Sequence, residues 1–397
     1  MKVLILINKV GLGDCIIHLN YIHEISKKYE KPVSILAKEN TRAKDLFQDD
    51  PHIEEVITLD RLENETGSHD GLNGFIKLIK DIKEKKFDKV FIFNSSVRYF
   101  LVCKFAGIKK IAQYPLFKKK GQHVVNTAKI FTENITGNIV PNKLYLNLGN
   151  FKFRDITNQA GVACENVWST GSALVDINGD GLLDIYVCKS GKPSGKKRHN
   201  ELFINNGDLT FSERSKEYGL DFTGLSVHAS FFDFDKDGDL DCYLLSNSIR
   251  SVGGYDLIED QRNIPSKEGN KFLVNENGIF VDKSDEVGIY TSEIGFGLGI
   301  TISDFNGDSW DDIYVSNDFF ERDYLYINNA DGTFSEELEY QIKSISAASM
   351  GADMADINND GYSEIFVTDM LPEPDERIKT VTTFDNWDRH QYIKTSG

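Results

Sequence analysis

The chain has 397 residues, 27% of them charged and 40% hydrophobic, which is the composition of a soluble globular protein. At roughly 100–200 residues per domain, two or three domains are expected. No apolar run reaches the roughly 18–20 residues of a membrane helix, and the first run, Val3–Ile7, is too short for a signal-peptide core. The sequence therefore predicts no transmembrane segment and, by the same criterion, a cytoplasmic protein.

The net charge of -17 is distributed unevenly. Residues 1–143 carry 24 Lys and Arg against 17 Asp and Glu, whereas residues 144–397 carry 21 against 45. Such an asymmetry suggests two modules with different roles. The five cysteines are scattered without a C-x-x-C pair, so buried free thiols are expected rather than disulfides or a zinc site.

The first module alternates strand and helix patterns. Strand-like apolar runs occur at 3–7, 33–37, 53–59 and 89–93, and helical spacing of apolar residues follows Gly13, recurs around Phe75–Ile82 and occurs again at 97–105. This alternation predicts parallel βαβ units in an open, doubly wound sheet. The expected class is α/β and Rossmann-like over residues 1–136.

The loop after the first strand is where such sheets usually bind ligands. Gly11 and Gly13 would let the backbone approach a ligand, and the helix that follows favours an anion. The third glycine of the dinucleotide fingerprint is absent. Gly11 and Gly13 are therefore candidates for cofactor binding, with a purely structural turn as the alternative.

Three segments resemble the N-terminal half of family 9, heptosyltransferase-like glycosyltransferases: the Gly-Leu-Gly-Asp loop, 33–40 and 50–57. The resemblance implies one half of a two-domain glycosyltransferase fold and makes Asp14 the candidate general base. A carboxylate there could take the proton of an attacking acceptor hydroxyl. The alternative is that Asp14 only caps the helix.

The resemblance covers about residues 1–130, and no second βαβ domain follows to hold a nucleotide-sugar. The basic runs at 83–86 and 118–120 could attract a phosphorylated acceptor or anionic lipid headgroups. The alternative is that both runs are solvated helix ends or loops. An anionic acceptor is thus one possible partner of this module.

The second module, residues 137–397, contains a fourfold repeat of the pattern D-x-[DN]-x-D-[GS]-x-x-[DE], which starts at Asp176, Asp233, Asp304 and Asp356. The starting residues are 57, 71 and 52 positions apart. A strand-like run follows each copy, and hairpin signals recur at 147–153, 205–211, 277–280 and 328–334. Such a period of short strands predicts propeller blades or a related array.

The loop chemistry favours calcium. Oxygen-bearing side chains at the first, third, fifth and ninth positions, with a backbone carbonyl from the seventh, would surround one hard cation. None of the four loops contains a His or Cys that would favour zinc. Asx-rich turns without metal are the alternative. The loop with Ser309 in place of Gly fits least well, because a side chain there resists a positive φ. The candidate ligands are Asp176, Asn178, Asp180, Leu182 and Asp184; Asp233, Asp235, Asp237, Asp239 and Asp241; Asp304, Asn306, Asp308, Trp310 and Asp312; and Asp356, Asn358, Asp360, Tyr362 and Glu364.

The repeat resembles the FG-GAP or VCBS family of calcium-loop β-propellers, in particular its cartilage-acidic-protein-like bacterial members. The resemblance implies an all-β propeller, here incomplete with four loops, that binds an unidentified protein or glycan ligand at a cell surface. It implies no catalytic set, and no nucleic-acid partner is expected.

Two functional hypotheses follow. In the first, a calcium-binding repeat module mediates adhesion behind a vestigial or acceptor-binding Rossmann-like domain. In the second, the chain is a glycosyltransferase of lipopolysaccharide or envelope glycan synthesis that uses Asp14 and borrows its donor site. The two halves imply different cellular locations, and the last turn signal precedes residue 370, so we expect a truncated chain or a chimera.

Overall fold

The computed structural model describes residues 1–7, 12–48, 50–61, 67–114, 124–137, 142–149, 153–164, 168–190, 199–247, 261–318, 321–346 and 349–369. The chain forms two compact units, Met1–Ile156 and Thr157–Gly397, called unit 1 and unit 2 below. The change of module was expected after residue 136, 20 residues earlier. The difference arises because the hairpin of β6 (Tyr145–Asn147) and β7 (Phe153–Asp155) contacts the first helix of unit 1.

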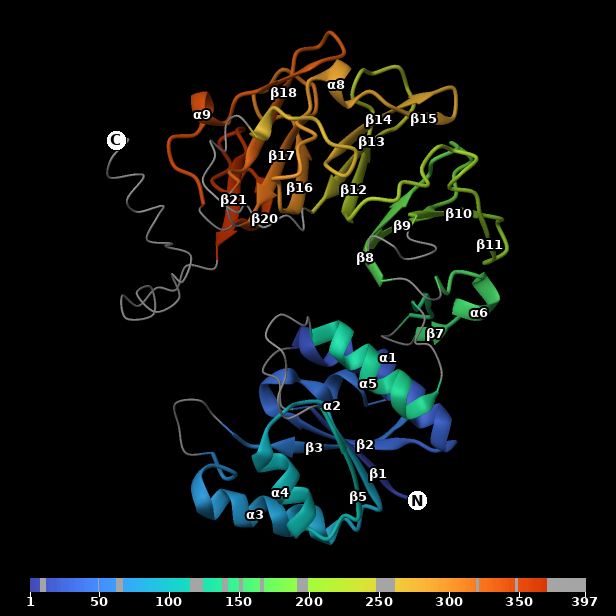
Figure 1. Ribbon diagram of the computed structural model, residues 1–397, viewed down its shortest axis with the longest axis vertical. Helices are drawn as coiled ribbons and strands as arrows, with labels where there is room; N and C mark the ends of the chain where they lie inside the picture. Colours follow the sequence, from blue (N-terminus) through green and yellow to red (C-terminus); the bar gives the residue numbers. More distant parts are fainter. Residues whose placement is uncertain are drawn as a thin grey trace. The chain divides into compact units, whose positions relative to one another are not determined.

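Unit 1 is a five-stranded parallel sheet with helices on both faces (Figure 1). Its strand order is β3-β2-β1-β4-β5. The strands are β1 (Val3–Ile7), β2 (Val33–Lys38), β3 (Ile53–Leu59), β4 (Lys89–Ile92) and β5 (Lys110–Gln113). The helices are α1 (Leu12–Tyr29), α2 (Ala43–Leu46), α3 (Gly71–Glu84), α4 (Val97–Phe105) and α5 (Val124–Thr136), with a 3-10 turn, η1 (Glu39–Thr41).

The alternation of side chains along β1 explains this layered core. Val3, Ile5 and Ile7 pack with residues of α1 and α5, whereas Leu4 and Leu6 pack with residues of α3 and α4. A strand that is buried on both faces has a continuous run of apolar residues in the sequence, which is why β1 could be predicted. The predicted doubly wound parallel sheet is confirmed, while β5 and α5 were not predicted.

Unit 2 consists of antiparallel sheets that follow one another along the chain (Figure 1). Sheet I contains β8 (Trp168–Val175), β9 (Asp184–Ser190), β10 (Glu201–Asn205) and β11 (Phe211–Glu213). Sheet II contains β12 (Ser226–Phe232), β13 (Asp241–Ser246), β14 (Lys271–Glu276) and β15 (Ile279–Asp282). Sheet III contains β16 (Gly297–Ser303), β17 (Asp312–Asn317), β18 (Tyr324–Asn328) and β19 (Phe334–Glu336). Sheet IV has two described strands, β20 (Ser349–Ala355) and β21 (Glu364–Asp369), and short helices lie at α6 (Thr157–Ala160), α8 (Ser284–Val287) and α9 (Leu338–Gln341).

The first strands of consecutive sheets contact one another, β8 with β12, β12 with β16 and β16 with β20. A Cβ atom added to Gly171 of β8 would lie 2.3 Å from the Val227 carbonyl oxygen of β12, so only glycine permits this approach. The apolar clusters lie between sheets I and II, II and III, and III and IV. The expected repeat array is therefore confirmed, as are all five cysteines as buried free thiols.

Buried polar bridges link sheet I to sheet II and sheet III to sheet IV. In sheet I, Asn200 Oδ1 accepts the Lys189 N–H at 2.8 Å, and its amide donates to Ser226 Oγ, at the start of sheet II, at 3.0 Å. In sheet III, Asp323 takes the same place. It accepts from the Asn317 N–H at 2.7 Å and from the Ser349 hydroxyl, at the start of sheet IV, at 2.8 Å.

Burial raises the pKa of Asp323 above its ordinary value. The ionised form of Asp323 is thus disfavoured in the folded state. Ionisation therefore lowers the free energy of unfolding, by nothing below the unfolded pKa of about 3.9 and by more as the pH rises above it. Asp323→Asn, which copies Asn200, should therefore stabilise unit 2 at pH 8 by about 1–3 kcal/mol and have little effect at pH 4. Denaturant unfolding at both pH values measures this. Asn200→Asp is the reciprocal control and should destabilise unit 2 at pH 8, whereas a loss of stability in Asp323→Asn at pH 8 would contradict the account.

Candidate functional site: the acidic loops

Each predicted acidic loop connects the first and second strands of one sheet of unit 2. Loop 1 spans residues 176–184, loop 2 spans 233–241, loop 3 spans 304–312 and loop 4 spans 356–364. Every residue of these loops is described, and the four loops share one backbone path. The structure therefore places the predicted ligands together within each loop, in four separate groups.

Two residues in each loop have a left-handed backbone. At the sixth position φ is +83° for Gly181, +97° for Gly238, +73° for Ser309 and +91° for Gly361. At the fourth position φ is +69° for Gly179, +60° for Lys236, +80° for Gly307 and +61° for Asn359. Ser309 adopts the turn despite its side chain, at a cost of about 1 kcal/mol. The turn at the sixth position was anticipated from the sequence, but the turn at the fourth was not.

The N–H groups of each loop bond to its own side chains. In loop 1, Asp176 accepts from the N–H groups of Asp180 at 3.0 Å and Gly181 at 2.8 Å. The N–H of the seventh residue, Leu182, donates to Asp180 at 2.8 Å. Loops 3 and 4 repeat these three bonds within 0.1 Å. The first and fifth side chains thus hold the turn through hydrogen bonds within the loop.

Loop 2 differs because its third position is Asp235 rather than Asn. In loops 1 and 3 the third-position amide donates to the fifth-position carboxylate, at 2.9 Å from Asn178 and 2.8 Å from Asn306. Asp235 has no donor to offer. Carboxylate oxygens of Asp233, Asp235 and Asp237 instead lie within 4.8 Å of one another.

Two carboxylate oxygens of loop 2 are buried without a hydrogen-bond partner, Asp233 Oδ1 and Asp239 Oδ1. Burial and the neighbouring carboxylates raise the pKa values of Asp235 and Asp239. Buried oxygens without donors are costly, and a cation supplies what they lack. By this test the residues of loop 2 fit a hard, oxygen-preferring cation, and they fit it better than the three loops with Asn.

In loops 1, 2 and 3 the ninth position joins the loop to the third strand of its sheet. Asp184 accepts the Ile177 N–H at 3.1 Å and the Asn205 N–H at 2.7 Å, one on each oxygen. Asp241 and Asp312 make the same pair of bonds, to Phe234 and Asn275 and to Phe305 and Asn328. All three carboxylates are almost completely buried.

Burial raises the pKa of Asp241 to about 7 and that of Asp312 to about 6. Such carboxyls gain from a nearby positive charge, since it favours their ionised form. Protonation would therefore oppose the binding of a cation at the ninth position below about pH 7 in loop 2 and below about pH 6 in loop 3.

The partner of the ninth residue was not identified from the sequence. Asn205, Asn275 and Asn328 each end or nearly end a third strand, and their amides donate to the carbonyl of the eighth loop residue, Leu183, Leu240 or Asp311, at 3.0–3.3 Å. The sequence signal was the Asn that recurs before each hairpin. It was interpreted only as a turn residue.

Loops 2 and 3 lie beside each other in unit 2. The Lys236 ammonium of loop 2 lies 4.1 Å from the ring centroid of Trp310 in loop 3, and the Asn328 amide donates to the Phe234 carbonyl at 2.8 Å. Trp310 was predicted to bind a cation through its backbone carbonyl. Its ring has a different role, because it packs against Lys236.

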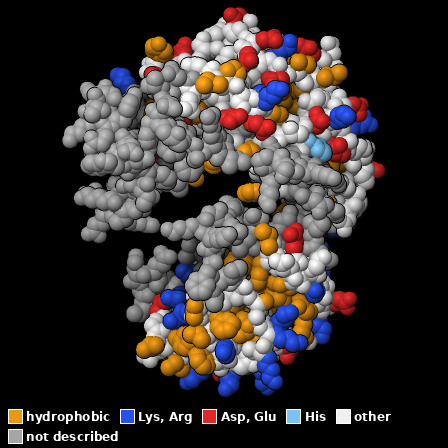
Figure 2. All heavy atoms as spheres, viewed as in Figure 1, with side chains coloured by type: hydrophobic (Ala, Val, Ile, Leu, Met, Phe, Trp, Pro, Cys, Tyr) orange, Lys and Arg blue, Asp and Glu red, His pale blue; other side chains and the backbone are white. Residues whose placement is uncertain are grey.

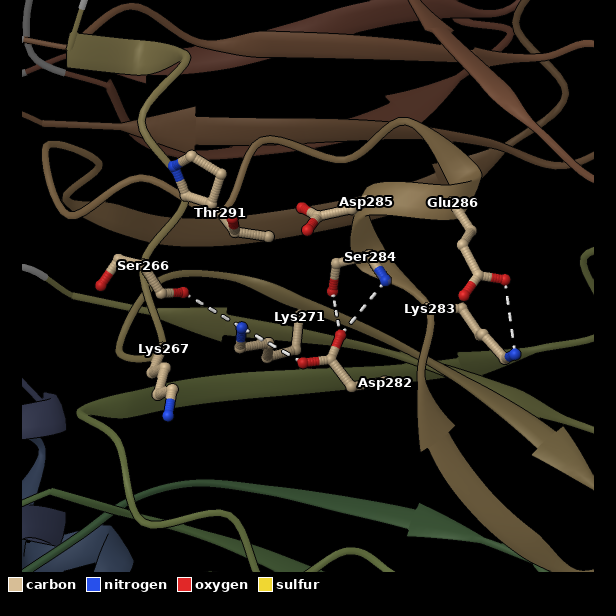
Figure 3. Close-up of a pocket in the computed structure, with 10 residues that line it drawn as sticks. Ser266, Lys267, Lys271, Asp282, Lys283, Ser284, Asp285, Glu286 and Thr291 are labelled. Carbon is tan, nitrogen blue, oxygen red and sulfur yellow. Dashed lines mark hydrogen bonds and ion pairs between the residues drawn. The ribbon is translucent and has the colours of Figure 1, made fainter.

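Unit 2 also contains a polar pocket of about 390 Å³ between β14, β15, α8 and residues 265–267 (Figure 3). Lys271 bonds to Asp282 at 3.2 Å and to the Ser266 carbonyl at 3.1 Å, and Lys283 pairs with Glu286 at 3.3 Å. Donors and acceptors are thus both present at its wall. Such a lining suits a neutral, polyhydroxylated or peptide-like ligand better than a strongly charged one.

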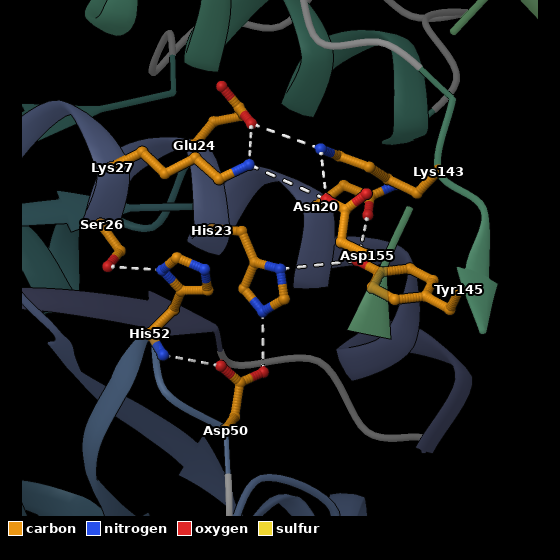
Figure 4. Close-up of polar contacts among 10 residues, drawn as sticks. All are labelled: Asn20, His23, Glu24, Ser26, Lys27, Asp50, His52, Lys143, Tyr145 and Asp155. Carbon is orange, nitrogen blue, oxygen red and sulfur yellow. Dashed lines mark hydrogen bonds and ion pairs between the residues drawn. The ribbon is translucent and has the colours of Figure 1, made fainter. Parts of the chain in front are cut away.

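In unit 1, Gly13 and Asp14 lie in the first turn of α1, directly after β1 at the centre of the sheet. Gly11 and Lys118–Lys120 lie outside the described residues. Further along α1, a buried polar cluster connects this helix to the β2–β3 connection and to β6 (Figure 4). The His23 ring bonds to Asp50 at 2.7 Å, and Tyr145 donates to Asn20 at 3.2 Å.

The cluster has a structural role. Burial alone would raise the pKa of Asp50, but the hydrogen bonds from the His23 ring and from the His52 N–H hold that pKa below its usual range. Ser26 lies 3.1 Å from the His52 ring but donates its proton to the Lys31 carbonyl at 2.9 Å, so it is not poised as a nucleophile. Lys143 pairs with Asp155 at 3.0 Å and with Glu24 at 3.6 Å. These contacts hold β6 and β7 against α1 in unit 1.

The sequence matches a family model for FG-GAP-like repeats at residues 132–187 and 304–367. Over 196 residues, 49% of this chain, it is 27% identical to cartilage acidic protein 1 of Xenopus tropicalis, and over 192 residues it is 28% identical to the Mus musculus protein. The chain covers only 27% of the length of either relative. The resemblance of the second module to FG-GAP-like repeat proteins is thereby confirmed.

Two solved glycosyltransferases match part of this chain. A family 9 glycosyl transferase from Veillonella parvula matches 34% of this chain and 41% of its own at 17% identity, with a TM-score of 0.29. E. coli ADP-heptose lipopolysaccharide heptosyltransferase II matches 28% of this chain and 30% of its own at 19% identity, with a TM-score of 0.22. The resemblance inferred from the sequence is thus found again. At this level of similarity it assigns neither substrate nor activity.

Proposed function

We propose that unit 2 is a calcium-binding repeat module that presents a rigid surface to a protein or glycan ligand. The observation that supports it most directly is loop 2, where three carboxylates converge and two buried oxygens have no donor. Calcium accepts six to eight oxygen ligands in flexible geometry, which suits a loop of alternating carboxylates better than magnesium does.

When bound, the cation would supply positive charge to loop 2. Asp233, Asp235 and Asp237 would hold it by their side chains, Asp239 by its carbonyl, and Asp241 at the ninth position. Loops 1, 3 and 4 are weaker candidates, because their third-position Asn donates to a neighbouring carboxylate, which lowers the demand for a cation. We therefore rank loop 2 first in affinity.

The protein or glycan ligand would bind to a surface formed by the sheets of unit 2. The polar pocket beside Lys271 is one candidate place for it, since the pocket offers hydroxyl, ammonium and carboxylate groups together. Calcium would act on this surface indirectly. It would fix the loops between first and second strands and thereby the sheets that carry the pocket.

The double variant Asp233→Asn/Asp237→Asn should remove the tightest calcium site of the full chain. Two charges are lost where the cation would bind, so its affinity should fall at least tenfold. Titration calorimetry in calcium-free buffer measures this.

The matched control is Asp208→Asn/Asp331→Asn, which removes two exposed carboxylates from hairpins and should leave calcium binding unchanged. Equal calcium binding by the wild type and the loop 2 variant would contradict the assignment. A wild type that binds no calcium at millimolar concentration would contradict the function itself.

A second candidate function is glycosyl transfer by unit 1. One observation favours it: Asn94, which follows β4, has a buried amide nitrogen without an acceptor. In the order β3-β2-β1-β4-β5 the strand order reverses between β1 and β4, and ligands of such sheets bind at that point. Asp14 follows β1, so it and Asn94 belong to the same edge of the sheet.

If this candidate is correct, the full chain should hydrolyse or transfer a nucleotide-sugar, and Asp14→Asn should reduce the rate at least a hundredfold by removing the general base. Release of the nucleoside diphosphate measures the rate. Asp45→Asn, on the exposed helix α2, is the control and should leave the rate unchanged. The candidate is excluded if the wild type turns over none of the common nucleotide-sugars.

A further inference from the structure

The outer face of α3 and α4 in unit 1 carries exposed apolar side chains. The most exposed are Leu72 (83%), Phe105 (60%), Val97 (53%) and Ile76 (52%). Figure 2 shows hydrophobic side chains gathered over these two helices, with Lys and Arg side chains at the margin. An exposed apolar group with a charged rim is typical of an interaction surface rather than of ordinary protein surface.

Contacts between the helices make this one surface. The Arg98 guanidinium of α4 donates to the Gly71 carbonyl at the start of α3 at 3.0 Å and lies 5.3 Å from the centre of the Phe75 ring. The Phe75 and Phe105 rings meet edge to face at 6.4 Å. The surface formed by Leu72, Phe75, Ile76, Val97 and Phe105 is called the α3–α4 surface.

The same segment holds nearly all of the excess positive charge of unit 1. Residues 71–110 contain 10 Lys and Arg against 3 Asp and Glu, a net charge of +7, while residues 1–156 together have a net charge of +8. Lys77, Lys80, Lys83 and Lys104 are exposed, and none of them forms an ion pair with another described residue. Their charges are thus available to an anionic partner.

We propose that the α3–α4 surface docks unit 1 on an anionic lipid bilayer. The apolar side chains enter the interfacial layer, and the surrounding lysines contact the headgroups. The contact is peripheral, because none of the described helices is long and apolar enough to cross a membrane. Peripheral binding to a bilayer strengthens with the apolar area inserted and with the attraction to anionic lipids, and this surface offers both.

A bilayer fits this surface better than the acidic unit 2 of a second copy does. Only 15 of the 44 Asp and Glu residues of unit 2 lie in the four acidic loops, where the first-position carboxylates already accept hydrogen bonds from the N–H groups of their own loop. A bilayer offers mobile anionic headgroups to flexible lysines and an apolar layer to Leu72 and Phe105. Repulsion between unit 2 and the bilayer is screened beyond about 10 Å at 0.1 M salt.

The test is co-sedimentation of the full chain with vesicles in 0.1 M salt, with phosphatidylcholine alone and with phosphatidylcholine containing about one-third phosphatidylglycerol. The chain should bind the anionic vesicles and bind the neutral ones much more weakly. Leu72→Ser/Phe105→Ser should weaken binding about tenfold or more. Lys77→Gln/Lys80→Gln should weaken it by about fivefold for each lysine.

The matched controls lie on α2, which packs with the opposite face of the sheet. Leu46→Ser and Lys44→Gln alter an exposed apolar residue and an exposed lysine there and should leave binding unchanged. The proposal is overturned if the wild type does not bind anionic vesicles, or if the α2 and α3–α4 variants bind equally. It is also overturned if light scattering shows a dimer that only the α3–α4 variants lose, because the surface then binds a second copy.

Discussion

The carboxylate at the ninth position of loops 1, 2 and 3 is the constraint on which unit 2 depends. Asp184, Asp241 and Asp312 each accept one N–H from their loop and one from the third strand of the sheet. One buried side chain therefore fixes the loop, the first two strands and the following hairpin together. The same arrangement recurs in three sheets, so the array is built from copies of one local solution.

This constraint also creates the demand for a cation. A buried carboxylate is costly to ionise, and the neighbouring first, third and fifth side chains add further negative charge. In loops 1 and 3 an Asn amide offsets part of that charge, whereas Asp235 adds to it in loop 2. The structure and the proposed cation binding thus depend on the same side chains. Unit 1 needs no such arrangement, because its parallel sheet is covered by helices on both faces.

Much of the fold could be predicted from the sequence where one signal was sufficient. The continuous apolar run of β1, the helical spacing in α3 and the fourfold acidic pattern each identified their element. The α1–hairpin contact could not be predicted, because it pairs Tyr145 with Asn20, which are far apart in the chain. The Asn that bonds to the ninth residue was missed, because Asn205 and Asn328 precede hairpins and Asn is a common turn residue. The difference between loop 2 and the other loops could not be predicted, because it depends on which buried carboxylate oxygens lack a hydrogen-bond donor.

The most direct test of the central claim is thermal unfolding of the full chain in millimolar calcium and in excess chelator. Calcium that binds only folded loops stabilises unit 2 by mass action, by about 2.7 kcal/mol at a hundredfold excess over the dissociation constant. The account predicts that the transition of unit 2 moves upward with calcium while that of unit 1 stays in place. If neither transition responds to calcium, the acidic loops are metal-free turns and the account is contradicted.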